Sequence, residues 1–226
     1  MAVAIAVPSY ADAPQGEPGA GLELAQNVAT GTVVGADQVP LQRAGPSGFF
    51  PVDTDCLSFD EYGYQTWSGG FAPGVSELGD ELSAIVDANN SFAAGVAICS
   101  NRAGLAVFVA ERDPELIAQI DAAAAKHPSL PVSIEDVAVG AGTAEAVALR
   151  LRDADFGSTI TAVGVDVHTG GLLVSVLPEA MSREADPVTA ESIHSYVLAV
   201  EGLELPVALE PVPAGEDSSG LADSAA

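Results

Sequence analysis

Residues 164–176, GVDVHTGGLLVSV, decide the fold. An extended apolar run leads into a Thr-Gly-Gly turn, after which apolar side chains alternate from Leu172 to Val176. Alternation with a period of two indicates a strand with one buried face, and two such runs joined by a turn indicate a β-hairpin. Residues 95–109 repeat the pattern, with alternation from Leu105 to Val109. The sequence therefore predicts two hairpins.

An Asp-Pro pair follows each hairpin, Asp113-Pro114 after the first and Asp186-Pro187 after the second. Aspartate is a favoured N-cap residue, and proline suits the first helical position because its missing N–H has no intrahelical partner there. Apolar residues at helical spacing follow both pairs. We therefore expect two helices, each starting at its proline.

A strand that opens with Leu-Pro follows each of these helices, at 130–137 and at 205–212. The expected fold is α+β, a tandem duplication of a strand-strand-helix-strand unit with two small three-stranded sheets. A third helix with the apolar stripe Val147, Leu149 and Leu151 is expected to join the units. Because proline cannot donate a ladder hydrogen bond, each Leu-Pro strand indicates an accessible edge to which another protein can add a strand.

The flanks of this domain differ from it in composition. Residues 8–48 are rich in proline and glycine and poor in large apolar side chains, which is typical of a disordered linker. The apolar start followed by Ser9-Tyr10-Ala11 resembles the end of an export signal, although no basic residue precedes Arg43, so an ordinary disordered start is the alternative. We divide the chain into a signal-peptide remnant (1–13), a disordered linker (14–48), an aromatic-rich section with a helix (49–92), the first repeat with its connecting helix (93–156), the second repeat (157–213) and a disordered tail (214–226).

Residues 49–71 hold most of the aromatic side chains of the chain. If exposed, they form a surface that binds sugar or peptide; if buried, they form an irregular lobe packed on the domain, which is the favoured interpretation. The same residues include Asp53, Asp55, Asp60 and Glu61, which lack the regular spacing of a calcium loop. We expect a solvated acidic loop there.

Cys56 and Cys99 are the two cysteines. Their spacing suits neither a zinc site nor a redox motif and favours a disulfide in an oxidising compartment. Two buried free thiols are the alternative. Together with the N-terminal residues, the pair predicts a protein that is secreted or resides in the cell envelope.

The chain is strongly acidic, with 7 Lys+Arg against 32 Asp+Glu and a formal net charge of −25 at pH 7. Such a charge repels nucleic acid and anionic membrane surfaces, so neither is an expected partner. No run of about 18 apolar residues is present, and no membrane insertion is expected.

His127, His168 and His194 are the histidines of the chain, and none stands at metal-ligand spacing with another ligand. The sequence also contains no recognisable Ser/His/Asp motif or phosphate-binding loop. We therefore predict no catalytic residue, no metal and no cofactor, and we expect the histidines to be structural, with His194 on the exposed side of its helix. The predicted protein is not an enzyme.

The segment from about 94 to 212 resembles the pro-region of bacterial secreted chymotrypsin-like serine proteases, of the alpha-lytic protease and streptogrisin type. The hairpin at 164–176 carries the likeness, with a Val-Asp pair, a turn containing threonine and then alternating valines. The first hairpin matches in layout only and has Cys99 where the family has none. The resemblance implies a propeptide that acts as intramolecular chaperone and inhibitor of its protease. No protease domain follows in this chain, so we expect a truncated precursor or a pro-region that acts in trans.

In that family the second sheet pairs with a hairpin of the protease, and the C-terminal tail lies in the active-site cleft. By resemblance, the tail is expected to begin at Glu210. The resemblance implies that these residues contact the partner: Val165, Asp166, Leu173, Ser175, Val207, Leu209 and Glu210. The alternatives are a cell-envelope adhesion or ligand-binding module that uses residues 49–71, or a truncated piece of a secreted serine protease.

Overall fold

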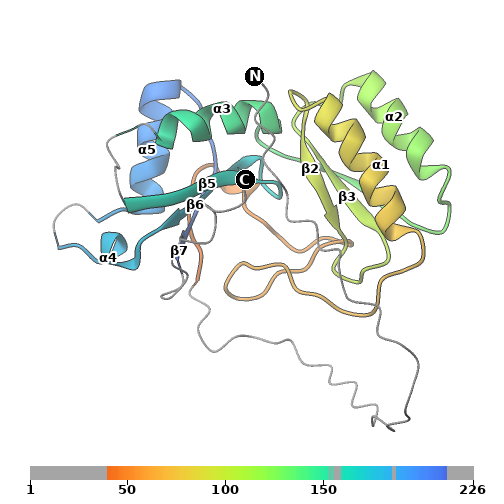
Figure 1. Ribbon diagram of the computed structural model, residues 1–226, viewed down its shortest axis with the longest axis horizontal. Coiled ribbons are helices and arrows are strands. Elements are labelled where there is room, and N and C mark those ends of the chain that lie inside the picture. The colour runs from red at the N-terminus through yellow and green to blue at the C-terminus, as the bar shows by residue number, and fades with distance from the viewer. Residues whose placement is uncertain (1–39, 153, 155–158, 185–186, 213–226) are drawn as a thin grey trace, which may run out of the picture. The chain divides into compact units, whose positions relative to one another are not determined.

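The structure is a computed structural model that describes residues 40–152, 154, 159–184 and 187–212. It has the predicted α+β class, with two separate sheets (Figure 1). Their strand orders are β1-β7-β6-β5 and β2-β3-β4. The predicted signal-peptide remnant and the predicted C-terminal tail lie outside the described residues.

The first unit contains α1 (Val75–Ala88), β2 (Ala93–Ile98), β3 (Leu105–Val109), α2 (Pro114–Ala124) and β4 (Val132–Asp136). Strands β2 and β3 form the predicted antiparallel hairpin, and β4 returns through α2 to lie parallel to β3. In this register Val107 is paired with Ile134. The prediction that the Leu-Pro strand lies beside its own hairpin is therefore confirmed.

The second unit contains α3 (Ala141–Arg152), β5 (Ile160–Asp166), β6 (Gly171–Val176), α4 (Pro178–Met181), α5 (Ala190–Glu201) and β7 (Val207–Pro211). Its register repeats that of the first unit, because β5 is antiparallel to β6 and β7 is parallel to β6, with Val174 paired with Leu209. The short helix α4 has no counterpart in the first unit among the described residues.

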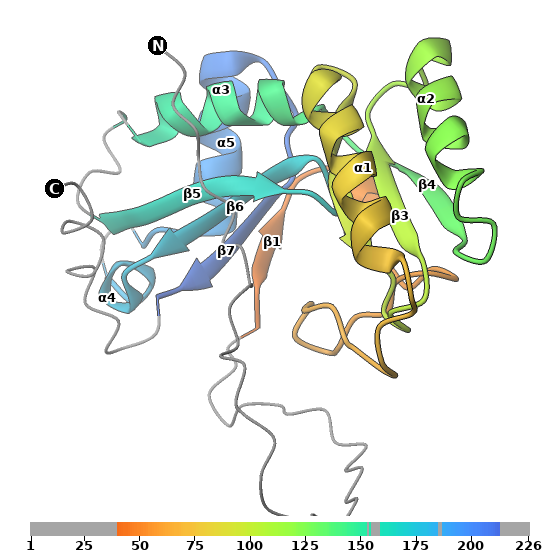
Figure 2. The same cartoon turned by 45° about the vertical axis from the view of Figure 1, so that its right-hand side comes forward.

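The duplication is longer than the sequence predicts, because each hairpin is preceded by a helix of its own. Helix α1 packs on β2 and α3 packs on β5, so α3 belongs to the second unit and does more than join the two (Figure 2). Each pair of helices covers one face of its sheet and buries an apolar core. Leu149, predicted in the core stripe of α3, is instead 58% exposed. It lies two positions, about 200° around the helix, from the buried Val147 and Leu151.

The two main crossover helices start differently. At α2 the prediction is confirmed, because Asp113 Oδ1 accepts hydrogen bonds from the N–H groups of Glu115 (2.9 Å) and Leu116 (3.0 Å). Helix α5 starts at Ala190 and not at Pro187, so that prediction is wrong. Thr189 and Ser192 exchange side-chain to backbone hydrogen bonds in a capping box, so the N-cap of this helix is Thr189.

The predicted linker 14–48 is wrong for the residues that the structure describes. Residues Gln42–Ala44 form strand β1, which lies antiparallel to β7, and a 3₁₀ turn follows at Ser47–Phe49. The second sheet therefore has four strands and not the predicted three. The outer edge of β7 was expected to be accessible because its strand opens with Leu-Pro, but β1 pairs with it.

Candidate functional site

The first sheet is covered on both faces. Every residue of β3 is buried, because α1 and α2 cover one face while Cys56, Leu57 and Phe59 pack with Ala106 and Phe108 on the other. The interpretation of the aromatic-rich section as a buried lobe is thus confirmed for this part of it. It is wrong for Trp67 and Phe71, which are 47% and 60% exposed.

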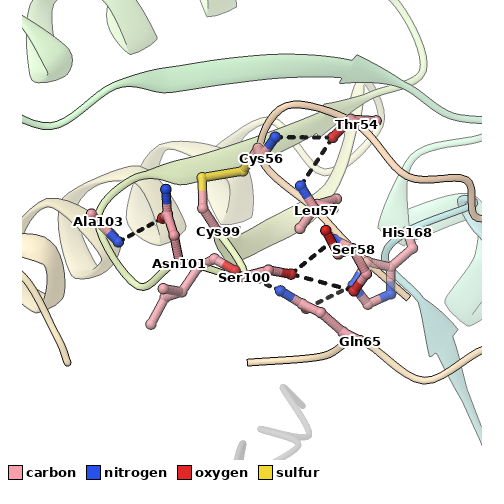
Figure 3. Close-up of a disulfide and its surroundings, with 11 residues drawn as sticks. Thr54, Cys56, Leu57, Ser58, Gln65, Cys99, Ser100, Asn101, Ala103 and His168 are labelled. Carbon is pink, nitrogen blue, oxygen red and sulfur yellow. Dashed lines mark hydrogen bonds between the residues drawn. A yellow bond between two sulfur atoms is a disulfide. The ribbon is translucent and has the colours of Figure 1, made fainter. Parts of the chain in front are cut away.

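The sulfurs of Cys56 and Cys99 lie at disulfide distance, 2.13 Å apart, and both residues are buried (Figure 3). The main chain reinforces the connection, since the Ser100 N–H donates to the Cys56 carbonyl at 2.8 Å. Ser100 Oγ also accepts from the Ser58 N–H at 2.8 Å. These contacts fix the aromatic-rich section to the turn of the first hairpin.

His168, in the β5–β6 turn, joins this section to the second unit. Its ring meets Phe59 and Phe108 edge to face, with ring centroids 5.4 Å apart in each case. Its Nε2 lies 3.3 Å from Gln65 Oε1, and Gln65 Nε2 donates to the Ile98 carbonyl at 2.8 Å (Figure 3). The group facing Nε2 is thus an amide and not a hydroxyl, so these contacts form no nucleophile-base pair.

Asp166 is buried inside the protein, with 8% of its surface exposed. Its carboxylate accepts from Arg43 Nη1 at 3.3 Å and from the His168 N–H at 3.1 Å. Burial is the largest single effect and raises the pKa of Asp166. The hydrogen bond and charge of His168, the charge of Arg43 and a hydrogen bond with Thr169 together lower it by more. The pKa of Asp166 therefore lies below its usual value. Asp166 therefore faces internal partners. Sequence reasoning missed Arg43, although it is the only basic residue before Arg102.

His194 is half-buried rather than exposed, which corrects the prediction for this residue. Its Nδ1 lies 2.8 Å from the Leu205 carbonyl oxygen. Because a carbonyl only accepts, Nδ1 carries the hydrogen and donates it. This bond ties α5 to the segment that opens β7, which is the structural role expected of the histidines.

The remaining predicted partner residues fall into two groups and one separate residue. Val207 and Leu209 are buried in the second core, together with the side chains of β6 that alternate from Leu172 to Val176. The half-buried Leu173, Ser175 and Glu210 lie at non-core positions in the strand alternation. Ser175 Oγ donates to Glu210 Oε1 at 2.8 Å. The last residue, Val165, is half-buried and packs against the core from β5.

Tyr64 lies close to this second group. Burial raises the pKa of the Tyr64 hydroxyl first, and the nearby carboxylates of Glu210 and Asp60 raise it further, against a smaller opposing effect of Arg43. The aromatic-rich section thus reaches the non-core face of the second sheet, where Leu173, Ser175 and Glu210 lie. Tyr64 therefore partly shields this face, which was predicted to contact the partner.

The other three sheet edges are shorter than β5 or carry a side chain bonded to a main-chain carbonyl. Strand β1 is three residues long, and the end of β2 gives its Ile98 carbonyl to Gln65. On β4, Arg112 bonds to the Ile134 carbonyl (3.4 Å) and to Asp136 (2.9 Å). Charged side chains at an edge discourage pairing with another chain.

The β5 edge is open. At seven residues β5 is the longest described strand, and it carries neither charge nor proline from Ile160 to Val165. Thr161, Ala162 and Gly164 are exposed, and no described strand pairs with the outer side of β5. This edge is the candidate site, because it offers unpaired N–H and C=O groups to a partner strand.

Comparisons with protein families, with curated proteins and with solved structures found no match. Within the described residues, no three His, Cys, Asp or Glu side chains gather as a metal site would need. Two of the carboxylates of the expected acidic loop bond to the main chain: Asp53 accepts from the Phe59 N–H, and Asp60 from those of Tyr62 and Tyr64. No described helix is long and apolar enough to cross a membrane.

Proposed function

We propose that the protein binds a secreted chymotrypsin-like serine protease as a pro-region or inhibitor, by adding a protease strand to the β5 edge. The observation that carries the proposal is the open β5 edge on the second unit, the unit whose hairpin resembles the family. Affinity comes from the main-chain ladder, and the exposed side chains of Thr161 and Ala162 contribute specificity.

The structure changes which strands are proposed to meet the partner. Since β1 covers β7, the side chains of Val207 and Leu209 support the sheet from within and leave the contact to β5. Residues after Val212 lie outside the described part of the chain, and their insertion in the protease cleft is the second half of the proposal. The acidity of the chain favours a protease with a basic rim, and association then slows as salt rises.

The test is a titration of a secreted chymotrypsin-like protease from the source organism with the whole chain, following hydrolysis of a peptide substrate. The edge variant carries Thr161→Lys and Ala162→Lys, because lysine on an edge strand disfavours pairing. The control carries Ser195→Lys and Ala199→Lys, which add the same charge on the exposed face of α5. Circular dichroism checks that both variants are folded.

We expect the whole chain and the control to inhibit alike, and the edge variant to inhibit at least about tenfold more weakly, a loss that corresponds to about 1.4 kcal/mol of binding free energy. Equal inhibition by the edge variant would remove β5 from the proposal. No inhibition by the whole chain would remove the proposed function. A version truncated after Val212 tests the tail, which is expected to be needed for full inhibition.

A further inference from the structure

Trp67 and Phe71 expose large aromatic surfaces beside one positive charge. The guanidinium carbon of Arg102 lies 5.6 Å from the centre of the Trp67 ring and 5.0 Å from that of Phe71, so both rings contact the cation. The other exposed large apolar side chains of the described residues are aliphatic. Leaving two rings in water forgoes apolar burial, and exposed aromatic patches usually mark binding surfaces.

The loop that carries these rings is held in place. The Ser68 N–H donates to the Ser100 carbonyl at 2.7 Å, and the Ala72 N–H donates to the Arg102 carbonyl at 2.9 Å. Arg102 Nη1 closes the arrangement by donating to the Gly69 carbonyl at 3.2 Å. The Cys56–Cys99 connection lies at the base of the same turn. The aromatic surface is therefore preorganised, which lowers the entropy cost of binding.

Arg102 has a backbone φ of +58°, alone among the described non-glycine residues in having a positive φ. This left-handed conformation costs about 1 kcal/mol for a residue with a side chain, and glycine would avoid the cost. The guanidinium of Arg102 is therefore held beside the two rings at a cost in backbone strain. Such strained positions cluster at functional sites.

The surface between the rings is small and polar. Ser68, Gly69 and Gly70 connect Trp67 to Phe71 and are all exposed, so the loop between the two rings carries no bulky side chain of its own. A ligand ring with an apolar C–H face can lie on the aromatic rings while its hydroxyl groups accept from the guanidinium and exchange hydrogen bonds with Ser68.

The charge of the protein narrows the class of ligand. A net charge of −25 repels anionic polymers, and one arginine does not reverse that field. The guanidinium in turn disfavours a cationic group between the rings. A neutral molecule with apolar ring faces and many hydroxyl groups fits both conditions. We propose that Trp67, Phe71 and Arg102 form a binding site for a neutral oligosaccharide. This site lies in the first unit and is separate from the β5 edge of the proposed function.

The chain offers a direct probe, because Trp67 is its only tryptophan. The experiment titrates the full-length protein with cellohexaose and, separately, with chitohexaose, and follows the Trp67 emission. We expect one of the two sugars to shift and quench the emission with saturation. Phe71→Ala and Arg102→Gly keep the tryptophan, and each is expected to weaken saturation about three- to tenfold. Arg102→Gly also relieves the backbone strain, and circular dichroism checks that both variants are folded.

The matched control is Val52→Ala, which trims an exposed apolar side chain of the same section, 66% exposed, outside the proposed site. It is expected to bind the sugar as the wild type does. No change in emission with either sugar would overturn the proposal, as would equal binding by the Phe71 and Arg102 variants. A change in emission with the protease and with neither sugar would also overturn it and assign the surface to a protein partner.

Discussion

Arg43 and Asp166, which are 123 residues apart in the chain, form an ion pair of 3.3 Å. Arg43 lies on β1 and Asp166 at the end of β5, the two outermost strands, and Arg43 Nη2 also donates to the Gly63 carbonyl at 3.2 Å. One arginine thus connects the N-terminal strand, the aromatic-rich section and the turn that carries His168.

Removal of this arginine is expected to destabilise the protein. Arg43→Ala leaves the buried Asp166 carboxylate with fewer partners, so we expect the free energy of unfolding to fall by about 1–3 kcal/mol. Urea denaturation followed by circular dichroism measures the change. Arg183→Ala removes an equal charge from an exposed position and is expected to change stability by less than about 0.5 kcal/mol. A similar effect of the two substitutions would contradict the role assigned to the ion pair.

The lowered pKa of Asp166 gives stability a defined pH dependence. Its pKa in the folded state lies below the unfolded value of about 3.8, so the stability it contributes is present above that value and is lost as the pH falls through the folded pKa. We therefore expect the wild type to lose more stability than Asp166→Asn between pH 5 and pH 3. Urea midpoints at both pH values measure this difference. If the wild type and Asp166→Asn lose the same stability between the two pH values, the acid sensitivity comes from other carboxylates.

The bond between Cys56 and Cys99 is expected to contribute strongly to stability. The two residues are 43 apart in sequence, for which loop closure in the unfolded chain corresponds to about 4 kcal/mol. The Cys56→Ala/Cys99→Ala variant is expected to lose about that amount in urea denaturation, and the reduced wild type is expected to match it. Mass spectrometry of the unreduced protein provides the first check, and two free thiols there would exclude the bond.

Local signals were enough to predict much of the fold, because the hairpins, the Asp113 cap and the Leu-Pro strands each depend on residues close together in sequence. Strand β1 was not predictable in this way. Its Gln-Arg-Ala sequence shows no alternation of its own and is extended because it pairs with β7. The start of α5 was misplaced because Ser192 stands where the usual capping-box signature has Glu or Gln, so the sequence does not mark Thr189 as the N-cap.

The candidate sites were harder to predict, because burial is a property of the folded chain. Val207 and Leu209 look like any alternating strand pair in sequence, and only β1 and the helices on the sheet make them inaccessible. Trp67 and Phe71 belong to the same aromatic cluster as the packed Phe59, and nothing in their spacing separates the exposed rings from the half-buried one.

Two glycines of the second hairpin provide a matched test of the sheet. A Cβ added at Gly171, the first residue of β6, would lie 2.1 Å from the Pro206 carbonyl oxygen, and backbone atoms cannot yield as a flexible side chain can. Gly171→Ala is therefore expected to push β7 away from β6 and to destabilise the protein by at least about 2 kcal/mol. At Gly164 on the exposed β5 edge, an added Cβ would meet nothing within 4 Å.

Gly164→Ala is accordingly expected to be neutral or to stabilise by up to about 1 kcal/mol, because alanine loses less backbone entropy than glycine on folding. Thermal denaturation of both variants beside the wild type measures the contrast. The pair also bears on the proposed function, because Gly171→Ala disturbs the sheet behind the edge whereas Gly164→Ala leaves the ladder groups of β5 in place. Protease inhibition should therefore survive Gly164→Ala and weaken with Gly171→Ala. Equal stability of the two variants would contradict the close approach of β6 and β7 at this point.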